Sequence, residues 1–214
     1  MKDFSKARER MVQEQLLVRN ICDQRVLSAM GSVPRHLFVE DALQAQAYGD
    51  FPLPIGEGQT ISQPYIVALM TQMLELKGTE RVLEIGTGCG YQTAVLSQLC
   101  DRVYSVERIK KLLARARINL DKALCFNTLC RVADGTMGWS QHAPYDAVIV
   151  TAGGPDIPEA LIAQLGDPGI MVIPVGDRVS QQLMLVKKEK GEVFVHPGEH
   201  VRFVSLIGAQ GWQM

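Results

Sequence analysis

A glycine-rich turn and a carboxylate about twenty residues further on are the residues whose types and spacing predict chemistry most directly. The turn, Glu84–Gly90, reads EIGTGCG and follows the apolar pair Val82 and Leu83. Glycines allow a tight turn and let a ligand approach the backbone closely. The carboxylate, Glu107, ends the apolar segment Val103–Val106, where it can accept hydrogen bonds from both hydroxyls of a ribose. Together these residues predict a nucleoside site.

The spacing of the glycines decides between two nucleoside cofactors. A nicotinamide dinucleotide site has a third glycine three residues after the second, and Tyr91 stands at that position here. An acidic residue followed by three alternating glycines, led here by Glu84, is similar to the first motif of the S-adenosylmethionine-dependent methyltransferases. Such a cofactor carries no pyrophosphate, which would require a helix N-terminus aimed at it. We therefore expect S-adenosylmethionine as the cofactor and S-adenosylhomocysteine as its product.

A third strand end supports the same cofactor. The segment Arg131–Ala133 is followed by Asp134 and Gly135, and in methyltransferases of this architecture such a carboxylate meets the adenine amino group. Each carboxylate could instead be a solvated charge on a loop. That alternative does not account well for acidic residues at the corresponding ends of three strands. The expected cofactor-binding residues are Glu84, Gly86, Thr87, Gly88, Gly90, Glu107, Asp134 and Gly135.

Nucleic acid is excluded as a substrate by two observations. The strand Tyr145–Val150 is followed by Thr151–Pro155, which lacks the polar-Pro-Pro-aromatic motif of the amino-methyltransferases that act on bases. The formal net charge is −1, from 22 lysines and arginines against 23 aspartates and glutamates. Proteins that bind the nucleic-acid backbone need a cationic excess. We expect no nucleic-acid partner.

The segment Leu53–Tyr65, LPIGEGQTISQPY, points to one family among the methyltransferases. Together with the glycine turn and the tail Val201–Leu206 (VRFVSL), it resembles the bacterial protein-L-isoaspartate O-methyltransferases, from about Met11 to about Gly208. The resemblance implies methyl transfer to the free carboxylate of L-isoaspartyl residues, with D-aspartyl residues as poorer substrates. The methyl ester then collapses to a succinimide, and hydrolysis returns some normal aspartate. The implied function is protein repair.

The resemblance also implies the substrate side of the site. Ser62 matches the active-site serine, and Thr60 and Ile61 beside it should line the peptide site. Arg202 is a further candidate because a guanidinium matches the geometry of a carboxylate. The alternative for Ser62 is an N-cap of the helix that begins near Pro64, and the alternative for Arg202 is an ion pair on an edge strand.

The expected chemistry needs few groups. A carboxylate with a pKa near ~4 is already ionised at neutral pH, so no general base is required. The chain accordingly shows no His or Cys placed as a catalytic dyad, and no metal is expected. His196 and His200 are separated by a Pro-Gly pair, which favours turn histidines over zinc ligands.

Three positions depart from the family pattern. Ala133 precedes the adenine motif where the family often has glycine, and Gly153 replaces an alanine after the central strand. Ser205 stands where the tail usually has proline, which would fix the backbone at the substrate edge. None of the three removes a chemical group from the site.

The elements that must position these residues follow from the apolar pattern. Residues 1 to about 47 are predicted to be helical, with Asp23 capping a helix, and residues 48–63 to form one irregular loop rich in glycine and proline. The predicted strands of an alternating α/β core are Arg81–Ile85, Arg102–Val106, Thr128–Ala133, Ala147–Val150 and Gly169–Val175. One predicted helix begins at Pro64, and three others span Tyr91–Leu99, Ile109–Leu120 and Pro158–Leu165. Three strands follow, Gln182–Lys187, Glu192–His196 and Val201–Ile207, as an antiparallel edge.

The expected fold is therefore a Rossmann-like α/β methyltransferase domain, with a mostly parallel twisted sheet covered by helices on both faces. We expect one domain over residues 1–214, divided into N-terminal helices and substrate loop (1–63), cofactor core (64–180) and C-terminal antiparallel strands (181–214). The hydrophobic share of 47% is ordinary for a globular protein.

Location and assembly are predicted from what the sequence lacks. It shows no membrane span and no signal peptide, and its five cysteines form no Cys-x-x-Cys pair, so we expect a cytoplasmic protein. A monomer is the default expectation. Rival functions are a nicotinamide-dependent oxidoreductase, a non-catalytic binder of modified peptides, and a methyltransferase for another carboxylate or small molecule.

Overall fold

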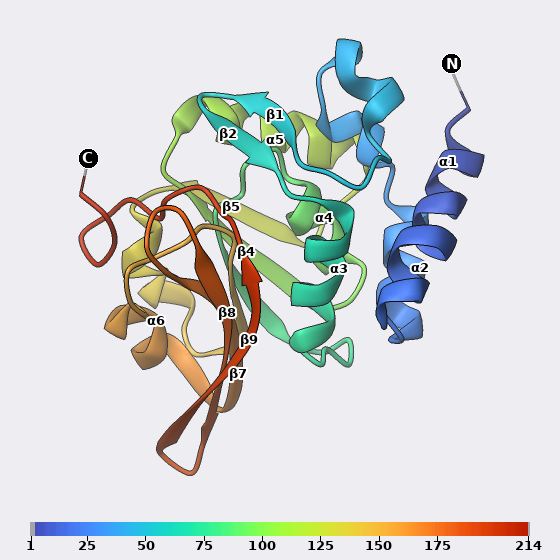
Figure 1. Cartoon of the computed structure of the whole chain (residues 1–214). Helices are drawn as coiled ribbons and strands as arrows, with labels where there is room; N and C mark the ends of the chain where they lie inside the picture. The colour runs from blue at the N-terminus through green and yellow to red at the C-terminus, as the bar shows by residue number, and fades with distance from the viewer. Residues whose placement is uncertain (1–2, 214) are drawn as a thin grey trace.

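A seven-stranded sheet forms the centre of the molecule in the computed structural model, which describes residues 3–213 (Figure 1). Met1, Lys2 and Met214, which the predicted domain includes, lie outside the described residues. The spatial order of the strands is β5-β4-β3-β6-β7-β8-β9. Neighbours from β5 to β7 are parallel, and β8 and β9 are added antiparallel. The strands are β3 (Arg81–Ile85), β4 (Arg102–Glu107), β5 (Thr128–Val132), β6 (Tyr145–Val150), β7 (Leu165–Gly176), β8 (Gln181–Glu189) and β9 (Glu192–Val201).

Helices cover both faces of the sheet because the central strands are apolar on both sides. Successive side chains of β3 enter two separate cores: Val82 packs with the N-terminal helices, whereas Leu83 and Ile85 pack on the opposite face. The first core also includes residues of α3 (Pro64–Met73), α4 (Tyr91–Ser97) and α5 (Lys110–Lys122), and the second includes Leu161 of α6 (Glu159–Gln164). This arrangement confirms the predicted fold class.

Residues 3–46 form the helical layer that the sequence predicts, and it packs beside α3 (Figure 1). Its elements are α1 (Ser5–Arg10), the π-helical turn η1 (Met11–Leu16), η2 (Leu17–Arg19), α2 (Gln24–Ser32), η3 (Arg35–Phe38) and η4 (Asp41–Gln46). The Asp23 side chain accepts hydrogen bonds from the N–H groups of Arg25 and Val26, which confirms the predicted cap.

Two predicted segments differ from the structure. The expected irregular loop contains a small hairpin, β1 (Leu53–Gly56) and β2 (Gln59–Ile61), whose turn uses Gly58 at a φ of 68°. The tail 202–207 is not a strand; it makes isolated bridges, such as Ser205 with Gly153. Instead, β9 runs on through the Pro-Gly pair that was expected to end it. An edge strand tolerates proline, and the register shifts there by a bulge.

Among residues 3–213, no helix is both long enough and apolar enough to span a membrane. In the same part of the chain, no three His, Cys, Asp or Glu side chains are grouped in a way that could hold a metal ion.

Candidate active site

The connections of the sheet create a crevice between β3 and β6. From β3 the chain moves outward to β4 and β5, then returns to the other side of β3 as β6. Crossovers that leave in opposite directions open a crevice at the carboxyl ends of the two strands, which is where open α/β sheets bind ligands. The glycine turn follows β3 and Thr151 follows β6, so both lie at this crevice.

An inner cavity opens at this crevice. Its wall includes Gly86 and Gly88 of the glycine turn, Glu107 at the end of β4 and Gly135 after β5. The hairpin β1–β2 forms one side and the tail residues 204–207 form another. Four of the eight predicted cofactor residues therefore meet in one cavity.

The glycine turn has the backbone that its sequence predicts. Gly86, Gly88 and Gly90 have φ values of 99°, 55° and 92°, a region that favours glycine. A Cβ on Gly86 would collide with the hydroxyl of Thr151, which itself donates hydrogen bonds to the carbonyls of Ile85 (3.0 Å) and Gly86 (2.8 Å). Thr151 is not among the predicted site residues, although a polar residue directly after a buried strand was a usable signal.

Gly90 and Thr87 contribute to the turn in other ways. Gly90 lines none of the cavities described here; it precedes α4, and a Cβ there would press on Leu120 of α5 at 3.2 Å. Thr87 is buried, and its hydroxyl lies 2.6 Å from the hydroxyl of Ser105 on β4. These two residues shape the turn by packing and by tying it to the neighbouring strand.

Glu107 lies where the sequence predicts a ribose-binding carboxylate. Its side chain is 6% exposed, and its two oxygens accept hydrogen bonds from the N–H groups of Gly88 (2.9 Å) and Ile109 (2.8 Å). Each carboxylate oxygen has a second lone pair, so Glu107 can still accept two hydroxyl groups. The fit to an adenosine ligand is good, because the cavity combines this acceptor with apolar walls from Val106 and Leu112.

The structure places Glu84 beneath the turn and away from the cavities. Its side chain is fully buried and lines none of the cavities, so a direct contact with the cofactor is not supported. Oε2 accepts hydrogen bonds of 2.5 Å from the hydroxyls of Thr93 and Ser105, and Oε1 has no partner among the described residues. Burial raises the pKa of Glu84 to about 8, against the effect of these two hydrogen bonds.

Asp134 has hydrogen-bond partners within the protein beside its predicted role. Gly135 lines the inner cavity, and the Asp134 carboxylate binds the protein itself: Oδ1 accepts from the N–H and hydroxyl of Thr136, and Oδ2 accepts from the N–H of Ala209 at 2.7 Å. Partial burial raises the pKa of Asp134, but the hydrogen bonds from Ala209 and Thr136 outweigh it and hold the pKa below its usual value. The carboxylate thus holds the C-terminal tail, whose residues 204–207 wall the inner cavity.

Two further cavities adjoin the inner one. A middle cavity is lined by Ile61, Ser62 and the glycine turn, and an outer cavity is lined by Ser62 and Arg202. Thr60 and Thr151 line all three cavities, so the cavities meet at this pair. The structure therefore brings together all four predicted substrate-binding residues, with Ser62 shared by the middle and outer cavities.

The hydroxyl of Ser62 is free to act on a ligand. The helix α3 begins at Pro64 with Gln63 as its N-cap residue, and no side chain caps it. Among the described residues the Ser62 hydroxyl makes no hydrogen bond, and its carbonyl accepts one of 2.7 Å from Arg35. The N-cap alternative for Ser62 is therefore not supported.

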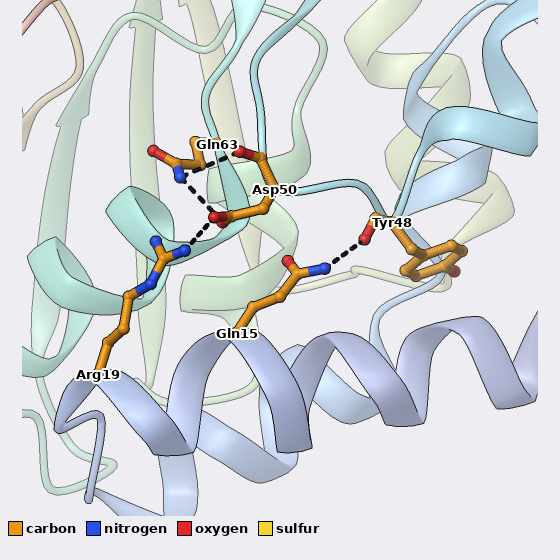
Figure 2. Close-up of polar contacts among 5 residues, drawn as sticks. All are labelled: Gln15, Arg19, Tyr48, Asp50 and Gln63. Carbon is orange, nitrogen blue, oxygen red and sulfur yellow. Dashed lines mark hydrogen bonds and ion pairs between the residues drawn. The ribbon is translucent and has the colours of Figure 1, made fainter.

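Contacts with the N-terminal helices hold the chain on both sides of Ser62 in place (Figure 2). Gln63 donates hydrogen bonds to the Asp50 backbone carbonyl (3.1 Å) and to its carboxylate (2.8 Å), and that carboxylate pairs with Arg19. Gln15 donates a hydrogen bond of 2.9 Å to the carbonyl of Tyr48. These partners were not predicted from the sequence, because they lie more than thirty residues from Gln15 and Arg19 along the chain.

Comparison with known proteins decides the family. Residues 6–211 match the family model described as Protein-L-isoaspartate(D-aspartate) O-methyltransferase (PCMT). The chain belongs to the protein-L-isoaspartate O-methyltransferase family. This membership confirms the resemblance found in the sequence, and it makes the chain an S-adenosylmethionine-dependent methyltransferase.

Relatives of known name match the chain over nearly its whole length. The protein-L-isoaspartate O-methyltransferase 1 of Syntrophobacter fumaroxidans is 56% identical over 214 residues and covers 100% of both chains. The protein-L-isoaspartate O-methyltransferase of Geobacter metallireducens is 54% identical and covers 98% of each chain.

Solved structures agree on the fold of the family. A protein-L-isoaspartate O-methyltransferase superimposes with a TM-score of 0.86 at 29% identity, over 95% of this chain and 67% of its own. A Plasmodium falciparum protein described as the same kind of enzyme, in complex with S-adenosyl-L-homocysteine, gives a TM-score of 0.82 at 24% identity, over 94% of this chain and 98% of its own.

Proposed function

We propose that this enzyme transfers a methyl group from S-adenosylmethionine to the free carboxylate of L-isoaspartyl residues in damaged proteins and peptides, and less efficiently to D-aspartyl residues. The observation that carries the site assignment is the position of Ser62. Its unpaired hydroxyl lies where the middle and outer cavities adjoin, next to the Thr60–Thr151 pair that borders the inner cavity. A substrate carboxylate held there faces the cofactor cavity.

Orientation and exclusion of water are the main demands of this reaction. The acceptor carboxylate is ionised at neutral pH, since its pKa is near ~4, and needs no base. When bound, S-adenosylmethionine supplies an electrophilic methyl group. We propose that the Ser62 hydroxyl donates a hydrogen bond to the carboxylate and aligns it. A hydrogen bond to a charged group contributes about 1.5–3 kcal/mol, or roughly 10–100-fold in rate.

The other substrate residues surround this point. Ile61 is buried in the wall of the middle cavity and keeps water from the acceptor. Thr60 borders all three cavities, and Arg202 lines the outer one, where a peptide enters. Among residues 3–213 Arg202 forms no ion pair, so its guanidinium is available for a peptide carboxylate or carbonyl.

The cofactor residues divide into two groups. We propose that Glu107 holds the ribose hydroxyls, and that Gly86, Gly88 and Gly135 allow the cofactor to approach the backbone. Thr87 lines the middle cavity beside them. The remaining predicted residues, Glu84, Gly90 and Asp134, shape the glycine turn or hold the tail.

The methyl ester product accounts for the protein-repair function that the family implies. A methyl ester can lose methoxide, whereas a free carboxylate would have to lose oxide. The neighbouring backbone nitrogen therefore attacks the ester carbonyl carbon, which closes a succinimide, and the methoxide leaves with the nitrogen's proton as methanol. Hydrolysis of the succinimide returns part of the residue to normal aspartate. The enzyme would thereby start the repair of isoaspartyl damage.

The decisive experiment uses two peptides that differ only in isoaspartate against aspartate, with radiolabelled S-adenosylmethionine. We expect base-labile label in the isoaspartyl peptide alone. Label in neither peptide, with S-adenosylhomocysteine still bound, would leave the methyltransferase assignment intact and overturn the substrate.

A cytoplasmic, monomeric enzyme without a nucleic-acid partner is the rest of the proposal. It is supported by five free cysteines, which suit a reducing compartment, and by a net charge of −1. Sedimentation at micromolar concentration would test the monomer.

A further inference from the structure

Arg35 is the one arginine whose side chain is completely buried among the described residues. It begins the short helix η3, and its guanidinium makes two hydrogen bonds of 2.7 Å, from Nε to the carbonyl of Ala47 and from Nη2 to the carbonyl of Ser62. Its Cζ lies 4.7 Å from the centre of the Tyr91 ring, at the start of α4. One side chain thus joins the substrate segment to the helix that follows the glycine turn.

This guanidinium has no carboxylate partner. None of the ion pairs formed by residues 3–213 includes Arg35, and its Nη1 has no hydrogen-bond partner there. Burying a charge without an opposite charge is costly, and this burial lowers the pKa of Arg35. An apolar or neutral side chain would avoid this cost of burying a charge, so the choice of arginine points to its contacts with Ser62 and Tyr91.

Ser62 depends on this contact. It follows β2 and precedes α3, so neither a strand ladder nor a helix holds its backbone. Among the described residues, the bond from Arg35 is the only hydrogen bond that Ser62 makes. Because the carbonyl and the side chain share one Cα, fixing the carbonyl limits where the hydroxyl can point.

We propose that Arg35 is a positioning residue for the acceptor site: its buried guanidinium fixes the Ser62 backbone and so aims the Ser62 hydroxyl at the substrate carboxylate. This inference rests on the proposed function, since it acts through Ser62. The contact with Tyr91 sets the distance between Ser62 and the glycine turn, which is the distance that must be right for methyl transfer. Small errors in such an alignment cost about 100-fold in rate.

The chain offers a matched control in Arg25. Its guanidinium also bridges two backbone carbonyls, those of Leu76 (2.8 Å) and Leu99 (3.0 Å), but it lines none of the inner, middle and outer cavities. A lysine at either position keeps the positive charge but lacks the planar guanidinium that binds two carbonyls at once. Comparing the Arg35 and Arg25 variants therefore distinguishes a loss of fold stability from a misalignment of Ser62 with the glycine turn.

The test compares Arg35→Lys, Arg35→Gln and Arg25→Lys at a temperature where circular dichroism shows each to be folded. Arg35→Gln is included because a neutral side chain is cheaper to bury and so is the safer variant for folding. We expect both Arg35 variants to lose at least about tenfold in kcat/KM for an isoaspartyl peptide. Their Kd for S-adenosylhomocysteine should stay within about twofold, because Arg35 does not line the inner cavity. Arg25→Lys should leave both quantities within the same limit.

A double-mutant cycle with Ser62→Ala separates positioning from general support. If Arg35 acts through the Ser62 hydroxyl, adding Ser62→Ala to an Arg35 variant should cost much less than it costs in the wild type. Additive losses, or unchanged kcat/KM in both Arg35 variants, would overturn the inference while leaving the proposed function in place. Failure of the wild type to methylate the isoaspartyl peptide would instead overturn the proposed function.

Discussion

The backbone N–H of Gly88 donates a hydrogen bond of 2.9 Å to the carboxylate of Glu107. This contact joins the glycine turn after β3 to the end of β4, and the second oxygen of Glu107 is held by the N–H of Ile109. The acceptor for the ribose is therefore fixed in place by the backbone that surrounds it. Preorganisation of this kind strengthens binding because less conformational freedom is lost when the ligand enters.

Replacing Glu107 should weaken cofactor binding. Glu107→Gln removes the charge and turns one acceptor oxygen into a donor, so both the backbone contacts and the ribose contacts suffer. We expect the Kd for S-adenosylhomocysteine, measured by calorimetry, to rise about 10–100-fold. Glu57→Gln is the control, because Glu57 pairs with Lys111 near the surface and lines none of the three cavities. Equal Kd values for the two variants would contradict the ribose role of Glu107.

Removing the Ser62 hydroxyl should lower activity without lowering stability. Ser62→Ala loses a hydrogen bond to the charged substrate, so kcat for an isoaspartyl peptide should fall about 10–100-fold. The hydroxyl has no partner in the described structure, so the free energy of unfolding should change by less than about 0.5 kcal/mol. Ser32→Ala, on the far end of α2, should leave the rate unchanged. A lower melting temperature with normal activity would support the cap instead.

Glu84 should make the fold more stable in acid than in base. Burial raises its pKa in the folded protein to about 8 from an ordinary value of 4.5, so between these values the folded protein binds a proton that the unfolded chain does not. Stability from this group is therefore lost as pH rises through that window, by at most about 1.4 kcal/mol per pH unit.

Glu84→Gln tests this dependence, because glutamine is neutral at every pH and keeps an acceptor for Ser105 and Thr93. Urea unfolding of both proteins at pH 5, 6, 7 and 8 should show the wild type losing stability relative to the variant as pH rises. Parallel stability curves would show that Glu84 is ionised in the folded protein.

The tail should control how firmly the cofactor is held. Ala209 is the second residue of a turn closed by the hydrogen bond from Gly211 N to Gly208 O, a position where proline is favoured. Ala209→Pro therefore removes the N–H that binds Asp134 with little strain elsewhere. Loss of about 1 kcal/mol of tail contact should speed the dissociation of S-adenosylhomocysteine about fivefold in stopped-flow measurements. Ala209→Ser keeps the N–H and should match the wild type; a proline variant that does so as well would rule out the tail contact.

The sequence by itself determined the family, the cofactor and the order of the α/β core. These features are local: the apolar runs mark β3, β4 and β6, and glycine alone suits the backbone of Gly86, Gly88 and Gly90. Because the carboxyl ends of parallel strands meet at one edge of the sheet, the positions of Glu107 and Gly135 also followed from their places in the chain.

Only the tertiary structure decided what each polar group touches. Glu84 and Asp134 stand at predicted strand ends, yet packing turns one toward Thr93 and Ser105 and the other toward Ala209. The contact of Arg35 with Ser62 spans 27 residues, and no periodicity reveals such a partner. The physical reason is that strand and helix patterns depend on neighbours in the chain, whereas hydrogen bonds in a core depend on which distant segments fold against each other.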